Sequence, residues 1–318
     1  MKVLFALGVC VSLSVTPAGF AADSSAIALT TPTGTLHGSL LLPAGEAPVP
    51  VALIIAGSGP TDRDGNSALI ATKNDSLKML AEALAEAGFA SVRYDKRGIA
   101  ASAAAGPAES DLRFEHYVQD ATAWLEYLAD DPRFSSTAVI GHSEGALIGL
   151  LAAIDRNVPY VSIAGPAVDA ATLIRRQLEG RLPPDLAAEH QRILAELEAG
   201  STVADVPAPL ASIYRASVQP YLISWIRYFP ARELTRLRAP CLVVQGTTDV
   251  QVSVADAETL QAGNPSCQLH IIGGMNHIMK AVPNDLQQQM ASYGDPSLPI
   301  DASLTAAIAS FLATHLAR

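Results

Sequence analysis

The sequence predicts an α/β fold with a mostly parallel central sheet flanked by helices. Three observations predict this class. An opening hairpin is followed by strand and helix patterns that alternate along most of the chain. Several predicted strands are continuous apolar runs, such as residues 51–56, as expected where helices cover both faces of a sheet. Finally, residues 137–140 form a strand that passes through a short glycine-bracketed segment into a helix.

The predicted elements follow one another in a regular order. Residues 27–42, interrupted at Thr33-Gly34, predict the hairpin. The helical pattern of residues 112–129 places an apolar stripe on one face, and a glycine ends the helix predicted at residues 77–88. The further predicted strands are residues 51–56, 89–94, 137–140, 160–164, 241–245 and 268–272. The further predicted helices are residues 146–153, 254–262 and 304–316.

Residues 166–235 interrupt this alternation with amphipathic helical segments and a proline-containing break at residues 206–209. They predict a helical cap inserted into a core made of residues 23–165 and 236–318. A chain of 318 residues is long enough for one large domain with such an insertion.

Residues 1–22 have the pattern of a secretory signal peptide. Lys2 is followed by an apolar run over residues 3–15 and by small residues that favour cleavage after Ala21. We therefore expect export, to the periplasm or the medium, and no later segment has transmembrane length. Export permits a disulfide between Cys241 and Cys267. Two buried thiols are slightly favoured, because a bridge between adjacent parallel strands needs awkward geometry.

The net charge is −10 and the pI is about 5.1. This balance argues against nucleic acid or an anionic membrane surface as a partner. The partner that we expect, from the motifs described below, is a small molecule. The sequence carries no signal for the oligomeric state.

The segment Gly141-His-Ser-Glu-Gly145 predicts a nucleophile elbow, a tight strand-to-helix turn that presents Ser143 in a strained conformation. Glycines two places before and after the serine let strand and helix approach. The free N–H groups and positive dipole end of the following helix then point at whatever Ser143 attacks. His142 is interpreted as structural, because its side chain should leave the elbow in another direction.

A serine hydroxyl needs a base, and the base needs a carboxylate. His277 lies in a glycine-rich loop after a predicted strand, at the edge where parallel sheets place their sites. Asp249 directly follows the strand at residues 241–245, and Asp169 is the competing acid. The order Ser143, Asp249, His277 is that of a hydrolase triad.

Two backbone N–H groups are predicted to form an oxyanion hole. One belongs to Glu144, the residue after the nucleophile. The other comes from the loop after residues 51–56, where Ser58 is preferred over Gly59 and Pro60 has no N–H. Glu144 itself is expected to be a helix-start acid that favours the dipole.

No motif predicts a cofactor or a metal site. Gly57-Ser-Gly59 lacks the third glycine of a dinucleotide loop, and residues 62–66 do not have the spacing of a calcium loop. An aromatic stripe at residues 221–229 is typical of core, but Tyr221 and Trp225 are also candidates for a substrate pocket under the cap.

From residue 51 to the C-terminus the chain resembles the α/β-hydrolase superfamily. Within it, residues 57–66, Gly141–Gly145, 163–166 and 275–279 are similar to a group of exported bacterial esterase-like serine hydrolases, linked by name to the serine aminopeptidase and dienelactone-hydrolase branches. One departure is Ala100, which stands where many relatives carry a second glycine after Gly98. Because that loop is structural in most relatives, the departure should affect only the rim of the site.

The resemblance implies a serine hydrolase with a helical cap, and we expect a carboxylesterase for short- or medium-chain acyl esters. An aminopeptidase- or amidase-like enzyme is the alternative, with Glu144 or Glu179 as the acid for a free amine. Thioesters remain open, and a catalytically silent binding protein is a less favoured alternative.

Overall fold

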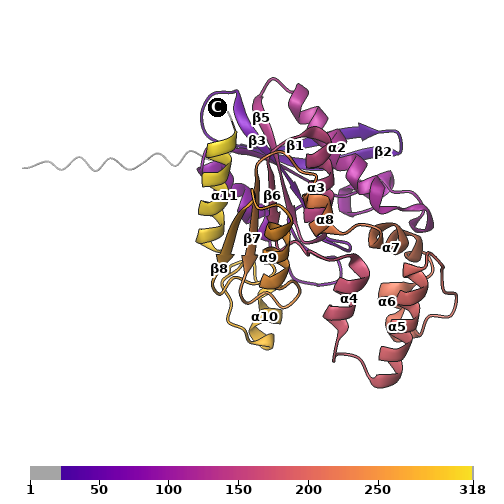
Figure 1. The fold of residues 1–318 in the computed structure, drawn as a ribbon. Helices are drawn as coiled ribbons and strands as arrows, with labels where there is room; N and C mark the ends of the chain where they lie inside the picture. The colour runs from indigo at the N-terminus through magenta and orange to yellow at the C-terminus, as the bar shows by residue number, and fades with distance from the viewer. Residues whose placement is uncertain (1–22, 317–318) are drawn as a thin grey trace, which may run out of the picture.

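The computed structural model describes residues 23–316, so the predicted signal peptide lies outside the described residues. Eight strands form one sheet in the order β1-β2-β4-β3-β5-β6-β7-β8 (Figure 1). The first hairpin is antiparallel, β2 pairs antiparallel with β4, and every later pair is parallel. The strands are β1 (Asp23–Thr31), β2 (Gly34–Leu42), β3 (Val49–Ile55), β4 (Ala90–Tyr94), β5 (Phe134–His142), β6 (Tyr160–Ile163), β7 (Cys241–Gly246) and β8 (Gln268–Ile272).

Helices cover both faces of this sheet, which confirms the predicted class. The helices are α1 (Ser76–Glu86), α2 (Phe114–Asp130), α3 (Glu144–Arg156), α4 (Ala170–Leu178), α5 (Pro184–Glu198), α6 (Ala211–Tyr214), α7 (Gln219–Ile226), α8 (Pro230–Leu234), α9 (Val254–Gly263), α10 (Leu286–Ser292) and α11 (Ala302–His315), with short 3-10 turns at Ala100–Ala105, Glu109–Asp111 and Ala208–Leu210.

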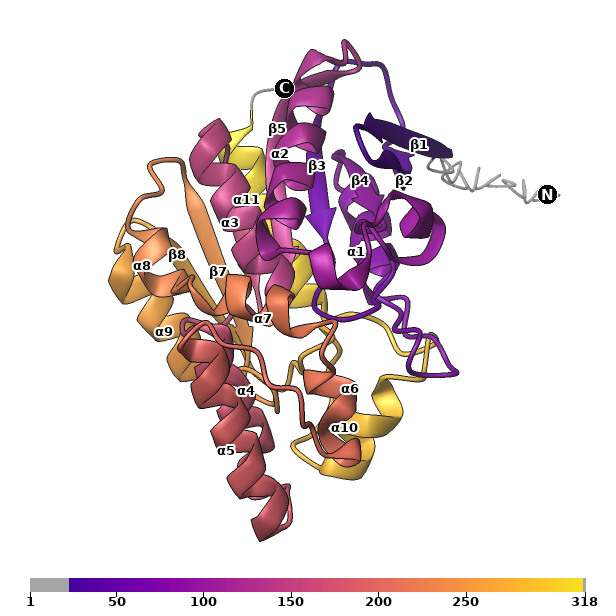
Figure 2. The ribbon, with the colours of Figure 1, turned by 90° about the vertical axis from the view of Figure 1, so that its right-hand side faces the viewer.

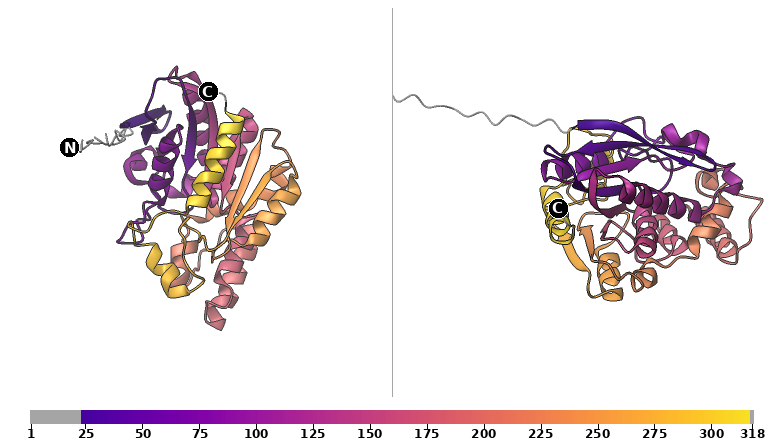
Figure 3. Two further views of the ribbon diagram at one scale, coloured as in Figure 1. Left: turned by 90° about the vertical axis from the view of Figure 1, so that its left-hand side faces the viewer. Right: turned by 90° about the horizontal axis from the view of Figure 1, so that it is seen from above.

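Alternate residues of the central strands supply two separate cores. Leu53 and Ile55 of β3 belong to the core beneath α2 and α3. Ile54, between them, belongs to the core beneath α1 and α11. Figure 3 shows α11 lying across the face of the sheet opposite α2 and α3. Because helices cover both faces of the sheet, a site can form at the carboxyl ends of the parallel strands.

The sequence pattern located most elements within a few residues. The predicted strand at residues 268–272 coincides with β8, whereas β5 begins at Phe134, three residues before the predicted start. The short helix α10 was not predicted within the proline- and glycine-punctuated segment 282–299. Its start is fixed locally, because the Asp285 carboxylate accepts a hydrogen bond from the N–H of Gln288 at 2.9 Å.

The expectation of two buried thiols is wrong, because Cys241 and Cys267 form a disulfide. Parallel pairing of β7 with β8 places Leu242 opposite Gln268, so the two cysteines stand side by side one position earlier. Their Cα atoms are 4.6 Å apart, which is within the range that a disulfide spans.

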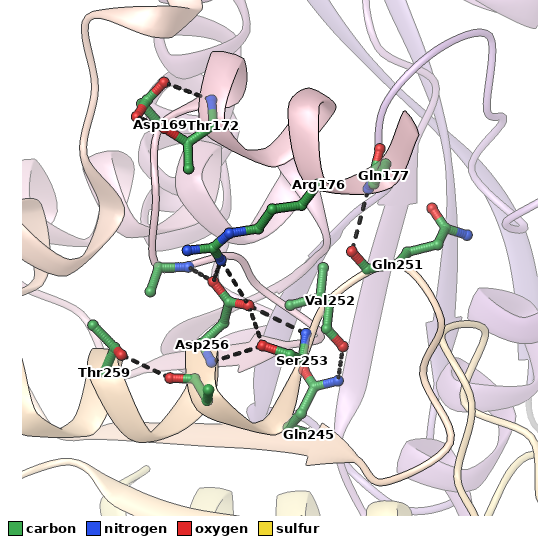
Figure 4. Close-up of polar contacts among 12 residues, drawn as sticks. Asp169, Thr172, Arg176, Gln177, Gln245, Gln251, Val252, Ser253, Asp256 and Thr259 are labelled. Atoms are coloured by element: carbon green, nitrogen blue, oxygen red, sulfur yellow. Dashed lines mark hydrogen bonds and ion pairs between the residues drawn. The ribbon is translucent and has the colours of Figure 1, made fainter. Parts of the chain in front are cut away.

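The predicted cap segment contains α4 to α8, between β6 and β7. Figures 1 and 2 show α4 to α7 gathered beyond the carboxyl ends of the parallel strands. Side chains attach this segment to the core at several places, among them α4 and α7. Arg176 of α4 contacts Asp256 of α9 at 3.2 Å, and Gln177 donates to the Gln251 carbonyl at 3.4 Å (Figure 4). On α7, the hydroxyl of Ser224 accepts from the N–H of Phe114 at 2.8 Å.

Among residues 23–316, no helix combines the length and the apolar character needed to cross a bilayer.

Candidate active site

Ser143 occupies a strained turn between β5 and α3. Its backbone angles are φ 55° and ψ −120°, a region that L-residues rarely adopt. The approach of strand and helix explains the flanking glycines. A Cβ on Gly141 would lie 2.1 Å from the carbonyl oxygen of Gly145, and a Cβ on Gly145 would lie 2.4 Å from that of Ile55. The turn therefore has the geometry that the nucleophile-elbow pattern predicts.

The described structure joins His277 to Asp249 rather than to Asp169. Nδ1–H of His277 donates to Oδ2 of Asp249 at 2.8 Å, and both side chains are buried. Asp249 follows β7, and its carboxylate also accepts from the N–H groups of Gln251 and Val252 at 2.7 and 3.0 Å. Burial alone would raise the pKa of Asp249, but the adjacent His277 and these hydrogen bonds hold it below its usual value. The carboxylate is thus an anion fixed against one imidazole nitrogen.

Asp169 has a different task. Its carboxylate caps α4 by accepting from the N–H and the hydroxyl of Thr172 at 3.0 and 2.7 Å. Figure 4 shows Asp169 turned toward Thr172 at the start of that helix. Both aspartates follow parallel strands, but only Asp249 bonds to the predicted base.

His142 connects the elbow to the loop that carries His277. Its Nε2–H donates to the backbone carbonyl of His277 at 2.7 Å, and the two ring centroids are 4.9 Å apart. Burial, reinforced by the nearby His277, lowers the pKa of His142 to about 4, so the ring is neutral at neutral pH. Ser143 is the next residue along the chain. Within residues 23–316 no hydrogen bond joins Ser143 to His277, so the contact between nucleophile and base stays a prediction.

The two predicted oxyanion donors lie at the start of α3 and in the loop after β3. Glu144 is the first residue of α3, so its N–H has no acceptor within the helix. Ser58 is exposed and follows Gly57. A Cβ on Gly57 would lie 3.2 Å from the Cβ of Ser143, so the two segments meet at Ser143.

The sequence did not predict the surroundings of the Glu144 side chain. One carboxylate oxygen accepts from the ammonium of Lys96 at 2.7 Å, and the other accepts from the hydroxyl of Tyr221 on α7. Burial, together with the charge of Glu144, raises the pKa of Tyr221 well above its ordinary value, so the hydroxyl is the donor. Lys96 also donates to the carbonyl oxygen of Gly57 at 2.6 Å.

A signal for Lys96 was present in the sequence. Asp95, Lys96 and Arg97 are three consecutive charged residues directly after a buried strand, and buried charges require partners. Each of the three forms an ion pair. Asp95 pairs with Arg63 of the loop after β3 at 2.9 Å, Lys96 pairs with Glu144, and Arg97 pairs with Asp120 of α2. The sequence interpretation limited this loop to the rim of the site, whereas Lys96 reaches Glu144, the residue beside Ser143.

Tyr221 and Trp225 are both buried and belong to an aromatic cluster with α2. The Trp225 ring stacks on Phe114 with centroids 6.0 Å apart, and the Tyr221 ring meets Tyr117 edge-on at 5.6 Å. Tyr221 reaches the site through its hydroxyl, at Glu144. A role for either residue in binding substrate stays a prediction.

In the part of the chain that the structure describes, no group of three or more histidine, cysteine, aspartate or glutamate residues could hold a metal ion.

Comparisons with known proteins agree with this architecture. Residues 72–220 match the model of the family described as serine aminopeptidase, S33. Esterase EstD of Thermotoga maritima is 26% identical over 258 residues, which are 77% of this chain and 58% of that protein. The match thus spans just over half of the relative's own length.

Solved structures of similar fold include several hydrolases. Est1E from Butyrivibrio proteoclasticus aligns with a TM-score of 0.58 at 16% identity, over 91% of this chain and 99% of that one. Dienelactone hydrolase from Anabaena variabilis aligns with a TM-score of 0.54 at 18% identity, over 93% and 99% of the two chains. The α/β hydrolase GrgF from a Penicillium species reaches 0.60 at 22% identity, over 93% and 100%.

Proposed function

Because the chain belongs by its fold to the α/β-hydrolase superfamily, we propose that it is a serine carboxylesterase that hydrolyses short- to medium-chain acyl esters. The observation that carries the proposal is the Asp249–His277 hydrogen bond at 2.8 Å, beside a serine held in a strained strand-to-helix turn. The likeness to an esterase and to the serine aminopeptidase family model supports a hydrolase of this class.

In the proposed reaction, Oγ of Ser143 attacks the ester carbonyl carbon while Nε2 of His277 takes the hydroxyl proton. Asp249 is bonded to Nδ1–H, so it fixes the tautomer in which Nε2 carries the free lone pair. The carbonyl oxygen becomes an oxyanion, which the N–H groups of Ser58 and Glu144 stabilise. When the C–O bond breaks, the proton on His277 passes to the departing alkoxide.

The acyl group is then bound to Ser143 as an ester. His277 removes a proton from water, and the resulting hydroxide attacks the acyl carbon through a second oxyanion. Collapse of that intermediate returns the proton to Oγ and releases the carboxylic acid. No metal or cofactor is needed for these steps, since the imidazole carries every transferred proton.

An aminopeptidase-like activity would require an acid that is free to bind the substrate amine. Glu144 lies beside the nucleophile, but Lys96 and Tyr221 occupy both of its carboxylate oxygens. Glu179 is exposed just after α4. The contacts of Glu144 support ester substrates over free amines, whereas the exposed Glu179 and the family-model match keep the amide reaction as the alternative.

The test combines active-site labelling with two substrate series. A fluorophosphonate probe should label the wild-type protein at Ser143 and leave Ser143→Ala unlabelled, and Ser143→Ala should lose esterase turnover. Among p-nitrophenyl esters, kcat/KM should be highest for short or medium acyl chains and should exceed that for aminoacyl anilides. Faster cleavage of the anilides would support the aminopeptidase alternative, and an unlabelled wild-type protein would support a silent binding protein.

We also propose that the protein is exported. The leader pattern of residues 1–22 supports this, and the Cys241–Cys267 disulfide suits an oxidising compartment. N-terminal sequencing of the mature protein from a periplasmic extract or the medium should begin at Ala22. An uncleaved chain in the cytoplasm would contradict the proposal.

A further inference from the structure

Lys96 contacts both segments that carry the proposed oxyanion donors. It lies two residues beyond the carboxyl end of β4, and only 1% of its surface is exposed. Its ammonium donates to the carbonyl of Gly57 at 2.6 Å and to the carboxylate of Glu144 at 2.7 Å. It also lies over the ring of Tyr117, 4.9 Å from the centroid. The Lys96 side chain is therefore buried and held in one position by these partners.

The contact with Gly57 controls the direction of the Ser58 N–H. The Gly57 carbonyl and the Ser58 N–H belong to the same peptide unit, which is planar. In a trans peptide these two groups point in opposite directions, so a carbonyl held by Lys96 fixes the N–H on the other side. A cation at the carbonyl oxygen also polarises the peptide, which strengthens its N–H as a donor.

The contact with Glu144 fixes the second donor. The backbone N–H of Glu144 stands at the free start of α3, and its side chain is tied to Lys96 and to Tyr221 of the cap. The residue is 3% exposed, so an unpaired carboxylate here would be costly. One ammonium therefore links the loop after β3, the elbow helix and, through Glu144, the cap helix α7.

We propose that Lys96 is a positioning residue that holds the oxyanion hole in its working geometry. This inference rests on the proposed esterase function, in which Ser58 and Glu144 supply the two N–H groups. Lys96 touches neither the substrate nor the reacting atoms. Without it, the Ser58 peptide is free to turn, and the enzyme stabilises the transition state less while it binds the ester as before.

The first variant is Lys96→Met, which keeps the length of the side chain and removes the ammonium. We expect kcat to fall about 100-fold, as for loss of one oxyanion donor, with KM changed less than about threefold. The inhibition constant of a trifluoromethyl ketone should rise by a similar factor, because its hemiketal oxyanion occupies the same hole. If Lys96 served only in packing, its loss would not lower kcat and ketone affinity by the same factor.

The double variant Lys96→Met/Glu144→Gln separates positioning from charge neutralisation. Glutamine removes the carboxylate that Lys96→Met leaves without its cation, so the thermal midpoint should recover toward the wild-type value. The Gly57 carbonyl still lacks its donor, so kcat should stay low. If the double variant regains wild-type kcat, Lys96 only neutralises Glu144 and the inference is wrong.

Arg97→Met is the matched control. Arg97 is the next residue, and its guanidinium bonds to Asp120 and Thr33, neither of which carries a proposed oxyanion donor. The variant should lower the thermal midpoint, whereas kcat per labelled active site should stay within about threefold of wild type. An equal loss of kcat in Arg97→Met would overturn the inference, because any broken ion pair in this loop would then have the same effect.

Fluorophosphonate labelling separates this inference from the proposed function. If the wild-type protein is labelled at Ser143 and Lys96→Met retains full kcat, the proposed function stands and the role of Lys96 is refuted. If the wild-type protein is not labelled, both are refuted. If the wild-type protein is labelled and Lys96→Met shows the paired loss of kcat and ketone affinity, both are supported.

Discussion

The two ends of the parallel strands are built differently. At the carboxyl ends the chain concentrates strained backbone and buried charge, with non-glycine residues at positive φ at Ser143, Ala164 and Met279 and a buried Lys96–Glu144 ion pair. At the amino ends of β7 and β8 a disulfide joins the strands directly. Strain and buried charge cost stability, and they persist where the surrounding structure over-determines them. We therefore expect changes to Asp249, His277 or Lys96 at the carboxyl ends to alter turnover, and changes at the amino ends to alter stability alone.

The sharpest test of this contrast compares two aspartates at the carboxyl ends. Asp249→Ala should lower kcat by about 10³- to 10⁴-fold, because His277 loses the partner that sets its tautomer. Asp169→Ala removes the cap of α4 and should cost about 1 kcal/mol of stability while kcat changes less than about threefold. Steady-state kinetics with a p-nitrophenyl ester and thermal melts measure both. Turnover retained without Asp249 would refute its assignment as the triad acid.

At the amino ends of β7 and β8, a substitution should lower stability and leave turnover unchanged. The double variant Cys241→Ser/Cys267→Ser opens a loop with a sequence separation of 26 residues and should lower the free energy of unfolding by about 3 kcal/mol. Turnover at 25 °C should be unchanged, because the disulfide lies at the end of the strands away from Ser143. Urea unfolding and esterase assays test this, and a reducing agent should destabilise only the wild-type protein. A large loss of turnover in the folded variant would show that the two ends are coupled.

His142 predicts a pH-dependent loss of stability at the carboxyl ends. Its pKa is about 4 in the folded protein against an ordinary value of 6.5, so between these values the unfolded chain binds the extra proton. Stability should therefore fall as the pH falls from 6.5 toward 4, by about 3 kcal/mol from this group.

His142→Gln isolates this contribution, since the glutamine amide can donate to the His277 carbonyl and does not titrate. His116 and His190, whose pKa values are also lowered by burial, contribute equally to both proteins. Urea unfolding at pH 7 and pH 4.5 should therefore show a smaller loss of stability in the variant. Equal losses in the two proteins would refute a buried neutral His142.

Features set by local sequence were predictable. The apolar runs predicted the central strands. The spacing of Gly141, Ser143 and Gly145 predicted the turn, because a Cβ on either glycine would lie only 2.1 or 2.4 Å from a carbonyl oxygen. The choice of Asp249 as the acid rested on its place directly after a predicted strand and on the chain order, and the structure pairs that residue with His277. The hydrogen bond between Ser143 and His277 remains untested.

Features set by long-range pairing were not predictable in the same way. Lys96 and Glu144 are 48 residues apart, and Tyr221 is 77 residues beyond Glu144. No periodicity links them, since their contact depends on how α3, α7 and the loop after β4 meet. The disulfide was missed for a related reason. The register of β7 against β8 decides whether Cys241 and Cys267 stand opposite one another, and single-strand patterns do not fix that register.

The smallest predicted effect tests whether strain at the carboxyl ends always serves the site. Ala100 has a φ of 43°, which explains why a glycine suits this position, and it is the first residue of the 3-10 turn that follows Gly98. Ala100→Gly should relieve the strain and, after the greater entropy of glycine in the unfolded chain, raise stability by about 0.5 kcal/mol.

Gly98→Ala is the matched control, because its φ is 82° and an added Cβ would meet nothing closer than 3.9 Å. That variant introduces strain without a clash and should lower stability by about 1 kcal/mol. Neither change should alter kcat, in contrast to the strained turn at Ser143, which is proposed to present the nucleophile. If Ala100→Gly instead lowers turnover in the folded enzyme, the strain at Ala100 also contributes to activity. The strained backbone at Ser143 would then not be the only strained position that affects turnover.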